Sequence, residues 1–196
     1  MGAGVKRGQA ATLIGLLFLS SGISTTESAN YHLNPAKTYN YILKTFIQNN
    51  VRVDIRADLT PGNNIFLSAA FTPHSGYHLY STRLPKKGID GAGRPTKFDI
   101  STQKPSGLKF SDSITDSPRP FNVTDKSLSK PLAIYPAGPV TLTRKGKYSP
   151  GTYNIIVRIT YMSCKSDGGC TIPVENKQLG FTLKISDKAL IVKEML

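Results

Sequence analysis

The chain has 196 residues, 39% of them hydrophobic, and its 25 Lys and Arg against 12 Asp and Glu give a formal charge of +13. This length fits one domain of ordinary size together with a leader. The positive charge favours an anionic surface or an acidic protein as a partner, although basic side chains scattered over a solvated surface would give the same count. Nucleic acid is excluded as a partner class, because the chain has no arginine-rich tract or aromatic RNA-binding motif.

The first segment has the residue order of a secretory signal peptide. Lys6 and Arg7 precede an apolar run over residues 10–23, which is followed by small and polar residues. The run is shorter than the roughly 20 residues that span a bilayer, so a cleaved leader is favoured over an uncleaved anchor. We expect residues 1–29 to be the signal peptide, the mature chain to begin near Asn30, and the protein to be periplasmic or secreted.

The body of the chain begins with an arm and continues with strands. Residues 30–50 show no sustained period and are expected to form a short helical turn or an irregular arm. Over residues 51–59 apolar and charged side chains alternate, which predicts a half-buried strand. The turn signal TPGNN at 60–64 separates it from NIFLSAAFTP at 64–73, which is typical of a more fully buried strand.

Later strands are shorter and are separated by Pro, Gly, Ser and Asp clusters. The clearest alternation runs over residues 153–161 and 179–185, and weaker strands are expected at 96–101, 107–111, 131–135 and 138–144. With 13 Pro, 17 Gly and no long amphipathic helix, the pattern predicts an all-β, immunoglobulin-like antiparallel β-sandwich over residues 51–196. Residues 101–130 are the least strand-like and are expected to form a functional loop or a mobile surface connection.

The only two cysteines, Cys164 and Cys170, lie in the stretch YMSCKSDGGCTIP at 161–173. The KSDGG tip predicts a hairpin, and directly opposed residues about 4.5 to 5.5 Å apart suit a disulfide. Export leaves two interpretations open: a structural bridge, whose small ring would contribute only about 2 kcal/mol, or a redox pair. A metal site would be incomplete, because Met162 is the one extra soft ligand nearby, and no cofactor is expected.

A resemblance to a known family bears on this choice. The stretch ITYMSCKSDGGCTIPVENKQLGF at 159–181 resembles the active-site hairpin of the N-terminal periplasmic domain of the thiol:disulfide interchange protein DsbD. The match is carried by Tyr161, Cys164, Gly168, Cys170 and Pro173. The segment GYHLYS at 76–81 also looks like the family's G-Y-x-L-Y segment, and the similarity extends loosely over residues 51–185.

The resemblance implies a domain that receives electrons from a membrane-embedded carrier and passes them to periplasmic disulfide proteins. Cys170 would then be the attacking nucleophile and Cys164 the resolving thiol, with Tyr77 and Tyr80 packed around the sulfurs. Ordinary strand packing is the alternative explanation for both tyrosines. His78 is placed near the cysteines by the same analogy, without an assigned role.

The chain departs from the family pattern in several ways. Thr171 and Gly169 stand where the family has an aromatic and a large side chain, and no acidic-aromatic cap loop is recognisable, which leaves Phe110 or Phe121 as candidate lid residues. The transmembrane and thioredoxin-like parts of full-length DsbD are not found, so a separate polypeptide is expected to be the electron donor. The rival function is a secreted binding module with a purely structural hairpin disulfide.

Overall fold

The computed structural model describes residues 29–32, 38–103, 107–186 and 189–195, and within these ranges its regular structure consists of β-strands. The part of the chain described here contains no helix long and apolar enough to cross a membrane. The expected signal peptide lies outside the described residues except for Ala29, which begins the first strand.

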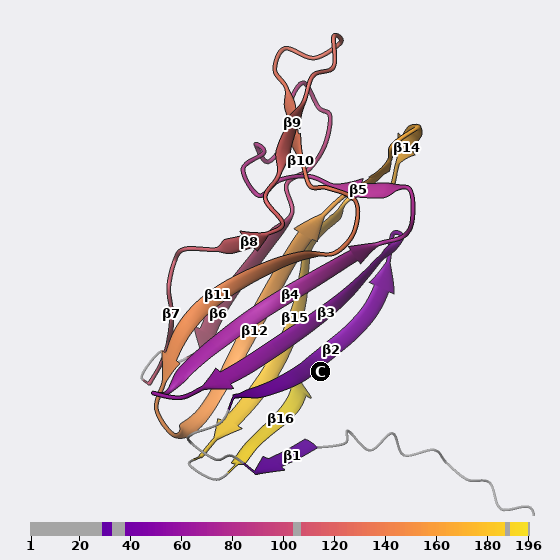
Figure 1. Ribbon diagram of the computed structural model, residues 1–196. Helices are drawn as coiled ribbons and strands as arrows, with labels where there is room; N and C mark the ends of the chain where they lie inside the picture. The colour runs from indigo at the N-terminus through magenta and orange to yellow at the C-terminus, as the bar shows by residue number, and fades with distance from the viewer. Residues whose placement is uncertain (1–28, 33–37, 104–106, 187–188, 196) are drawn as a thin grey trace, which may run out of the picture.

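Two antiparallel sheets form the body of the molecule (Figure 1). The first has six strands, namely β2 (Tyr39–Gln48), β3 (Val51–Thr60), β4 (Asn64–Pro73), β11 (Val140–Tyr148) and β7 (Leu108–Phe110) in that order, with β8 (Thr115–Ser117) also paired to β11. The second has five strands in the order β1 (Ala29–His32), β16 (Ala189–Met195), β15 (Val174–Ile185), β12 (Gly151–Tyr161) and β6 (Lys97–Gln103).

The core lies between the two sheets. Alternate residues of the central strands turn inward and are fully buried, among them Val53 and Ile55 of β3, Leu67 of β4, Ile155 of β12 and Phe181 of β15. Side chains alternate between the two faces of a strand, and the apolar and polar residues alternate in the sequence in the same way. The predicted immunoglobulin-like β-sandwich is confirmed.

The segment expected to be a helical turn or an irregular arm instead contains β2, a ten-residue strand paired with β3. Its pairing register shifts between Ile42 and Lys44. Such a bulge inserts an extra residue and breaks the alternation, so the apolar pattern lost its period in the sequence. Tyr41, before the bulge, is buried, and Phe46, after it, packs against the core.

The outer face of β3 carries a buried carboxylate. Asp54 is only 5% exposed and accepts hydrogen bonds from Thr45 Oγ1 at 2.7 Å, Arg52 Nε at 3.1 Å and Arg56 Nη2 at 3.2 Å. Burial raises the pKa of Asp54, but the hydrogen bonds from Thr45, Arg56 and Arg52 together outweigh it, so the pKa lies below its ordinary value of 3.8.

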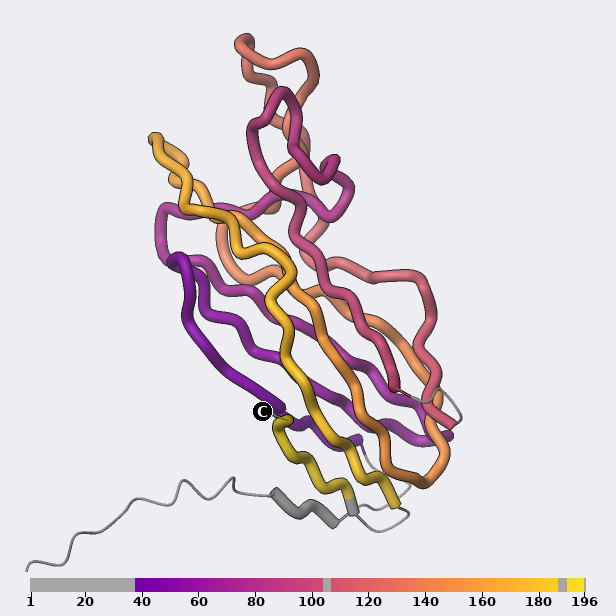
Figure 2. The backbone as a smooth tube through the Cα atoms, turned by 180° about the vertical axis from the view of Figure 1, so that it is seen from behind, coloured from indigo at the N-terminus to yellow at the C-terminus, as the bar shows by residue number. Residues whose placement is uncertain are grey.

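Three segments extend beyond one end of the sandwich. The cysteine hairpin is residues 163–171, in which β13 (Ser163–Lys165) pairs with β14 (Gly168–Cys170) and with β5 (Tyr77–Leu79). The cap loop is residues 82–96, and the cap hairpin is residues 118–134, which contain β9 (Phe121–Val123) paired with β10 (Leu132–Ile134). Figures 1 and 2 show the three segments at the same end of the sandwich, where the tip of the cysteine hairpin points away from the two cap segments.

Candidate functional site

The cysteine hairpin brings the two cysteines face to face. Cys164 and Cys170 are register partners with a Cα–Cα distance of 4.0 Å, slightly shorter than the sequence predicted, and their sulfurs form a disulfide. Gly168 and Gly169 take positive φ angles of 150° and 23°, which glycine adopts without steric cost. The hairpin with its turn at the KSDGG tip is therefore present as predicted.

The two halves of the disulfide differ in exposure. Cys164 is 2% exposed and packs in a small apolar cluster with Tyr80, Leu84 and Met162, against which Leu132, Ala133 and Ile134 of the cap hairpin also pack. Cys170 is exposed on β14. A protein that approaches this disulfide from solvent therefore meets Cys170 first.

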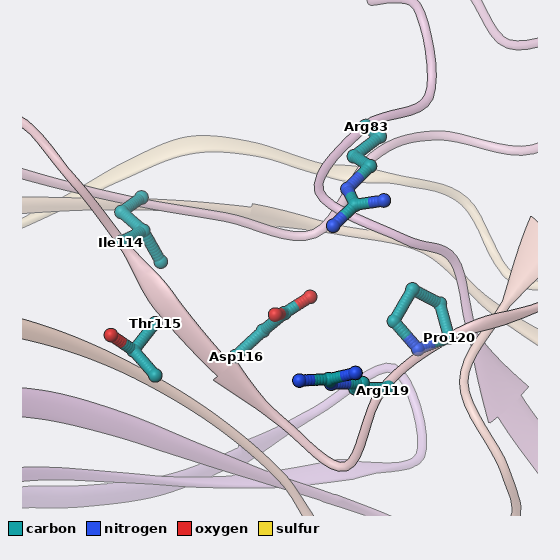
Figure 3. A pocket seen from close by; sticks show the side chains of 6 residues that line it. All are labelled: Arg83, Ile114, Thr115, Asp116, Arg119 and Pro120. Atoms are coloured by element: carbon teal, nitrogen blue, oxygen red, sulfur yellow. The ribbon is translucent and has the colours of Figure 1, made fainter.

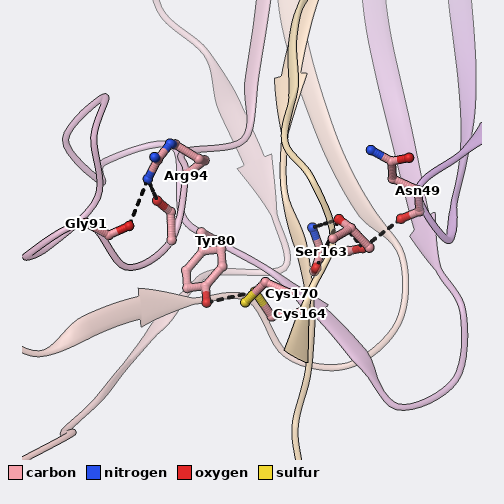
Figure 4. The surroundings of a disulfide bond; sticks show 9 residues. Asn49, Tyr80, Gly91, Arg94, Ser163, Cys164 and Cys170 are labelled. Carbon is pink, nitrogen blue, oxygen red and sulfur yellow. Dashed lines mark hydrogen bonds between the residues drawn. A yellow bond between two sulfur atoms is a disulfide. The ribbon is translucent and has the colours of Figure 1, made fainter. Parts of the chain in front are cut away.

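Tyr80 contacts the buried sulfur. Its hydroxyl donates a hydrogen bond to Cys164 Sγ at 3.1 Å (Figure 4). Burial raises the pKa of Tyr80, so the hydroxyl keeps its proton at physiological pH and remains a donor. The backbone of Tyr80 is fixed on both sides, by a bridge to Ile134 and by a 2.7 Å hydrogen bond from Thr96 Oγ1 to its carbonyl oxygen.

The cap loop packs onto the ring of Tyr80. Gly93 approaches so closely that a Cβ atom there would lie 2.9 Å from two carbons of the Tyr80 ring. Arg94 holds this part of the loop, because its Nη1 donates to the carbonyl oxygens of Lys87, Gly91 and Gly93 at 3.0, 3.0 and 2.7 Å. Figure 4 shows the hydrogen bond to Gly91. Tyr80 and apolar side chains thus cover the buried cysteine, and the glycine-rich backbone of the cap loop packs against the Tyr80 ring.

The two candidate lid residues lie in different parts of the structure. Phe110 is part of β7 and packs against the main core between the sheets, so it is not a lid for the sulfurs. Phe121 lies on β9 of the cap hairpin and is 49% exposed.

The register of β5 separates the residues of the GYHLY segment. His78 is paired with Cys164, and Tyr77 is paired with Lys165. Because side chains alternate along a strand, His78 and Tyr80 share the face of Cys164, whereas Tyr77 points to the opposite face. The rings of His78 and Tyr80 meet edge to face at 5.4 Å. Burial lowers the pKa of His78, so its imidazole is neutral near pH 7.

The base of the cysteine hairpin is held by hydrogen bonds that do not involve the sulfurs. Thr171 N donates to Ser163 O at 2.9 Å, and Ser163 Oγ donates to Asn49 O at 2.7 Å in the turn between β2 and β3 (Figure 4). Asn49 Nδ2 in turn donates to Ile172 O at 2.6 Å. The hairpin is therefore attached to the rigid sandwich at its base, while its tip is exposed.

The described residues contain no group of three or more His, Cys, Asp or Glu side chains arranged to hold a metal ion.

No protein-family model and no curated protein matches this sequence. The solved structures similar to it include two that each share 13% sequence identity with it. The N-terminal periplasmic domain of ScsB from Proteus mirabilis matches with a TM-score of 0.47 over 77% of this chain and 54% of its own, so this chain spans about half of that one. The Neisseria meningitidis DsbD N-terminal domain, in the reduced form, matches with a TM-score of 0.34 over 81% of this chain and 94% of its own.

Proposed function

We propose that this protein is a periplasmic thiol:disulfide interchange domain that carries electrons through Cys164 and Cys170 to or from partner disulfide proteins. The observation that carries the proposal is the unequal pair: an exposed cysteine is bonded to a buried one whose sulfur accepts a hydrogen bond from Tyr80. The DsbD-like sequence motif and the compartment expected from the leader support it.

The oxidised protein would accept two electrons in two exchange steps. A partner thiolate attacks Cys170 Sγ, the intramolecular S–S bond breaks, and its electron pair goes to Cys164, which leaves as a thiolate. A second partner thiolate then attacks the partner sulfur of the mixed disulfide and releases the Cys170 thiolate. The partner ends with a disulfide, and the two thiolates of this chain take protons from solvent according to their pKa values.

The reduced protein would run the same steps in reverse. The Cys170 thiolate attacks a partner disulfide and one partner sulfur leaves as a thiolate. The Cys164 thiolate then attacks Cys170 Sγ of the mixed disulfide, which releases the second partner sulfur and restores the Cys164–Cys170 bond. Cys164 serves as the resolving group because the cap segments keep it from contact with a partner.

Tyr80 and the cap segments would divide these roles between the two sulfurs. An apolar environment disfavours a thiolate on Cys164, and the Tyr80 hydroxyl offsets this by donating to the sulfur on which charge develops. Burial of Cys164 directs an incoming thiolate to Cys170. We therefore expect Cys164 to be the leaving group and Cys170 the attacked sulfur. Tyr77, on the opposite face of β5, would contribute to the strand and not to the sulfurs.

The rival function, a binding module with a purely structural disulfide, predicts that the bridge is needed to hold the hairpin. The hydrogen bonds from Thr171 and Ser163 already close its base, and a ring of this size contributes only about 2 kcal/mol. This arrangement favours reversible exchange over a permanent bridge.

A redox titration against glutathione tests the function. We expect a reduction potential between about −120 and −230 mV, in the range of known exchange catalysts, whereas a value below about −300 mV would identify an inert structural bridge. A matched pair of variants adds a direct readout: Cys164→Ser, which keeps the exposed thiol, should form a mixed disulfide with oxidised glutathione detectable by mass spectrometry. Cys170→Ser, which keeps only the buried thiol, should not. Equal labelling of the two variants would contradict the assigned roles.

The periplasmic location rests on the leader, and we propose that it is cleaved near Asn30. N-terminal sequencing of the exported protein tests this proposal. A membrane-embedded carrier is proposed as the electron donor.

A further inference from the structure

The end of the molecule that holds the cysteine hairpin carries an excess of positive charge. The cap loop, the cap hairpin and the cysteine hairpin together contain eight basic and three acidic residues, a net charge of +5 from 8 minus 3. Six of the basic side chains are exposed on the two cap segments, namely Arg83, Lys86, Lys87, Arg119, Lys126 and Lys130. Lys165, also exposed, lies next to Cys164. We call these seven side chains the basic collar.

The collar forms no close ion pair within the described part of the chain, although Asp90 interacts electrostatically with Lys130 and Asp116 lies between Arg83 and Arg119. The ion pairs found there involve other basic residues, including Arg94, the eighth, whose Nε lies 3.9 Å from Glu175. Two of the three acidic residues are hydrogen-bonded within the cap segments instead. Asp90 accepts from Ser129 N at 2.6 Å, and Asp125 accepts from Ser127 N at 2.9 Å.

Arg83 and Arg119 of the collar also line a pocket of about 570 Å³ (Figure 3). The side chains of Arg83 and Arg119 project into this hollow on either side of Asp116. The carboxylate of Asp116 accepts a 2.8 Å hydrogen bond from the hydroxyl of Tyr135. Burial raises the pKa of Tyr135 to about 12. Guanidinium groups presented in this way suit carboxylate side chains of a second protein, because the planar fork binds a carboxylate through two parallel hydrogen bonds.

Exposed apolar side chains accompany the charges. Ile172, two residues after Cys170, is 83% exposed, and Phe121 and Val123 of the cap hairpin are 49% and 38% exposed. Apolar contacts beside a charged rim are typical of protein interfaces. The chemistry points the same way, because the partner must present a sulfur to Cys170, which a lipid surface does not supply.

We propose that the basic collar selects the redox partner: a thiol or disulfide protein whose reactive cysteine is surrounded by acidic side chains. This inference rests on the proposed exchange function and names its partner class. Opposite charges on the two surfaces raise the rate of encounter by about 10- to 1,000-fold at low salt. The effect disappears as the Debye length falls from about 30 Å at 0.01 M salt to about 3 Å at 1 M.

Two peptide probes test the inference. Each carries one cysteine as a mixed disulfide with thionitrobenzoate, flanked in one peptide by four glutamates and in the other by four lysines. The reduced protein is mixed with each probe, and the release of thionitrobenzoate gives the rate, which is divided by the rate of the same probe with the neutral thiol 2-mercaptoethanol. We expect the acidic probe to react at least about tenfold faster at 0.01 M salt, and the ratio to approach one at 1 M.

Charge-reversal variants locate the effect. We expect the double variant Lys86→Glu/Lys87→Glu, and separately Lys165→Glu, to lower the preference for the acidic probe at least about threefold at low salt. The matched control for Lys165→Glu is Lys184→Glu, the same change of charge at an exposed position near the far end of β15, which should leave the preference unchanged. Each variant is also measured with the neutral 2-hydroxyethyl disulfide, so that changes in thiol reactivity are separated from docking.

The outcomes distinguish the two proposals. If the reduced protein fails to react with 2-hydroxyethyl disulfide, the exchange function is refuted and the partner inference with it. If it reacts but the two probes give equal normalised rates, exchange stands and the acidic partner is refuted. Equal probe rates together with collar-dependent binding to phosphatidylglycerol vesicles would also overturn the inference and make the collar a lipid-binding surface.

Discussion

Replacing Tyr80 with phenylalanine would remove a single oxygen atom beside the buried sulfur. The ring stays in contact with Gly93 and His78, while the 3.1 Å hydrogen bond to Cys164 Sγ is lost. A hydrogen bond to a charged group stabilises it by about 1.5 to 3 kcal/mol. With about half of the charge on the leaving sulfur at the transition state, the barrier rises by about 0.75 to 1.5 kcal/mol, and exchange slows about 4- to 13-fold.

The assay follows reduction of the disulfide by dithiothreitol in stopped flow. A second readout is the pKa of the Cys164 thiol, measured from thiolate absorbance in a Cys170→Ser background, which we expect the Tyr80→Phe change to raise by about 1 to 2 units. The matched control is Tyr77→Phe, which removes the same atom on the opposite face of β5. If the two tyrosine variants behave alike in both measurements, the role of the Tyr80 hydroxyl is refuted.

Three further variants or conditions test other parts of the structure. Gly93→Ala should slow exchange as Tyr80→Phe does, because the added methyl group would lie 2.9 Å from the Tyr80 ring and displace it. The matched control is Gly91→Ala, where φ is also positive, at 85°, but the space is open. This control should lower the free energy of unfolding only by the backbone cost of about 1 to 2 kcal/mol. Asp54→Asn should lower the free energy of unfolding at pH 7 by about 1 to 3 kcal/mol in urea titrations. The pKa of Asp54 is lower in the folded than in the unfolded protein, so the stability that its carboxylate contributes is full above about pH 4 and is lost as the pH falls through the folded pKa. Below the folded pKa, the unfolding free energies of wild type and variant should converge. Parallel curves of unfolding free energy against pH would contradict this. Reduction of the disulfide should cost only about 2 kcal/mol and leave the circular dichroism spectrum of a folded β protein, and unfolding on reduction would contradict the hydrogen-bonded base of the hairpin.

The sequence predicts the sandwich well wherever one face of a strand is buried and the other is solvated. Residues 51–59 and 153–161 alternate for this reason, and both form central strands. β2, the edge strand beside β3, was not predicted, because its bulge interrupts the alternation of apolar residues. β16 carried no prediction, because it begins with a continuous apolar run, ALIV, which periodicity alone does not assign to a strand.

The candidate site is predictable only in part. Turn chemistry placed the two cysteines on a hairpin, and strand alternation within GYHLY was an available signal that Tyr77 and Tyr80 lie on opposite faces. The difference in exposure between the cysteines was not predictable, because Cys164 is covered by segments that are remote in sequence and have no shared pattern. The contact of Gly93 with the ring of Tyr80 likewise depends on how the cap loop folds back.

The hydrogen bonds at the base of the cysteine hairpin have a consequence for recognition. The hydrogen bonds of Thr171 N, Ser163 Oγ and Asn49 attach the two legs of the hairpin to the sandwich without using the sulfurs, so we expect them to persist when the disulfide is reduced. If the pair gains and loses two electrons as proposed, the outline of this end is expected to stay nearly constant. A partner that distinguishes the reduced from the oxidised protein would then have to do so by reacting with the sulfur atoms, and not by recognising a change of shape.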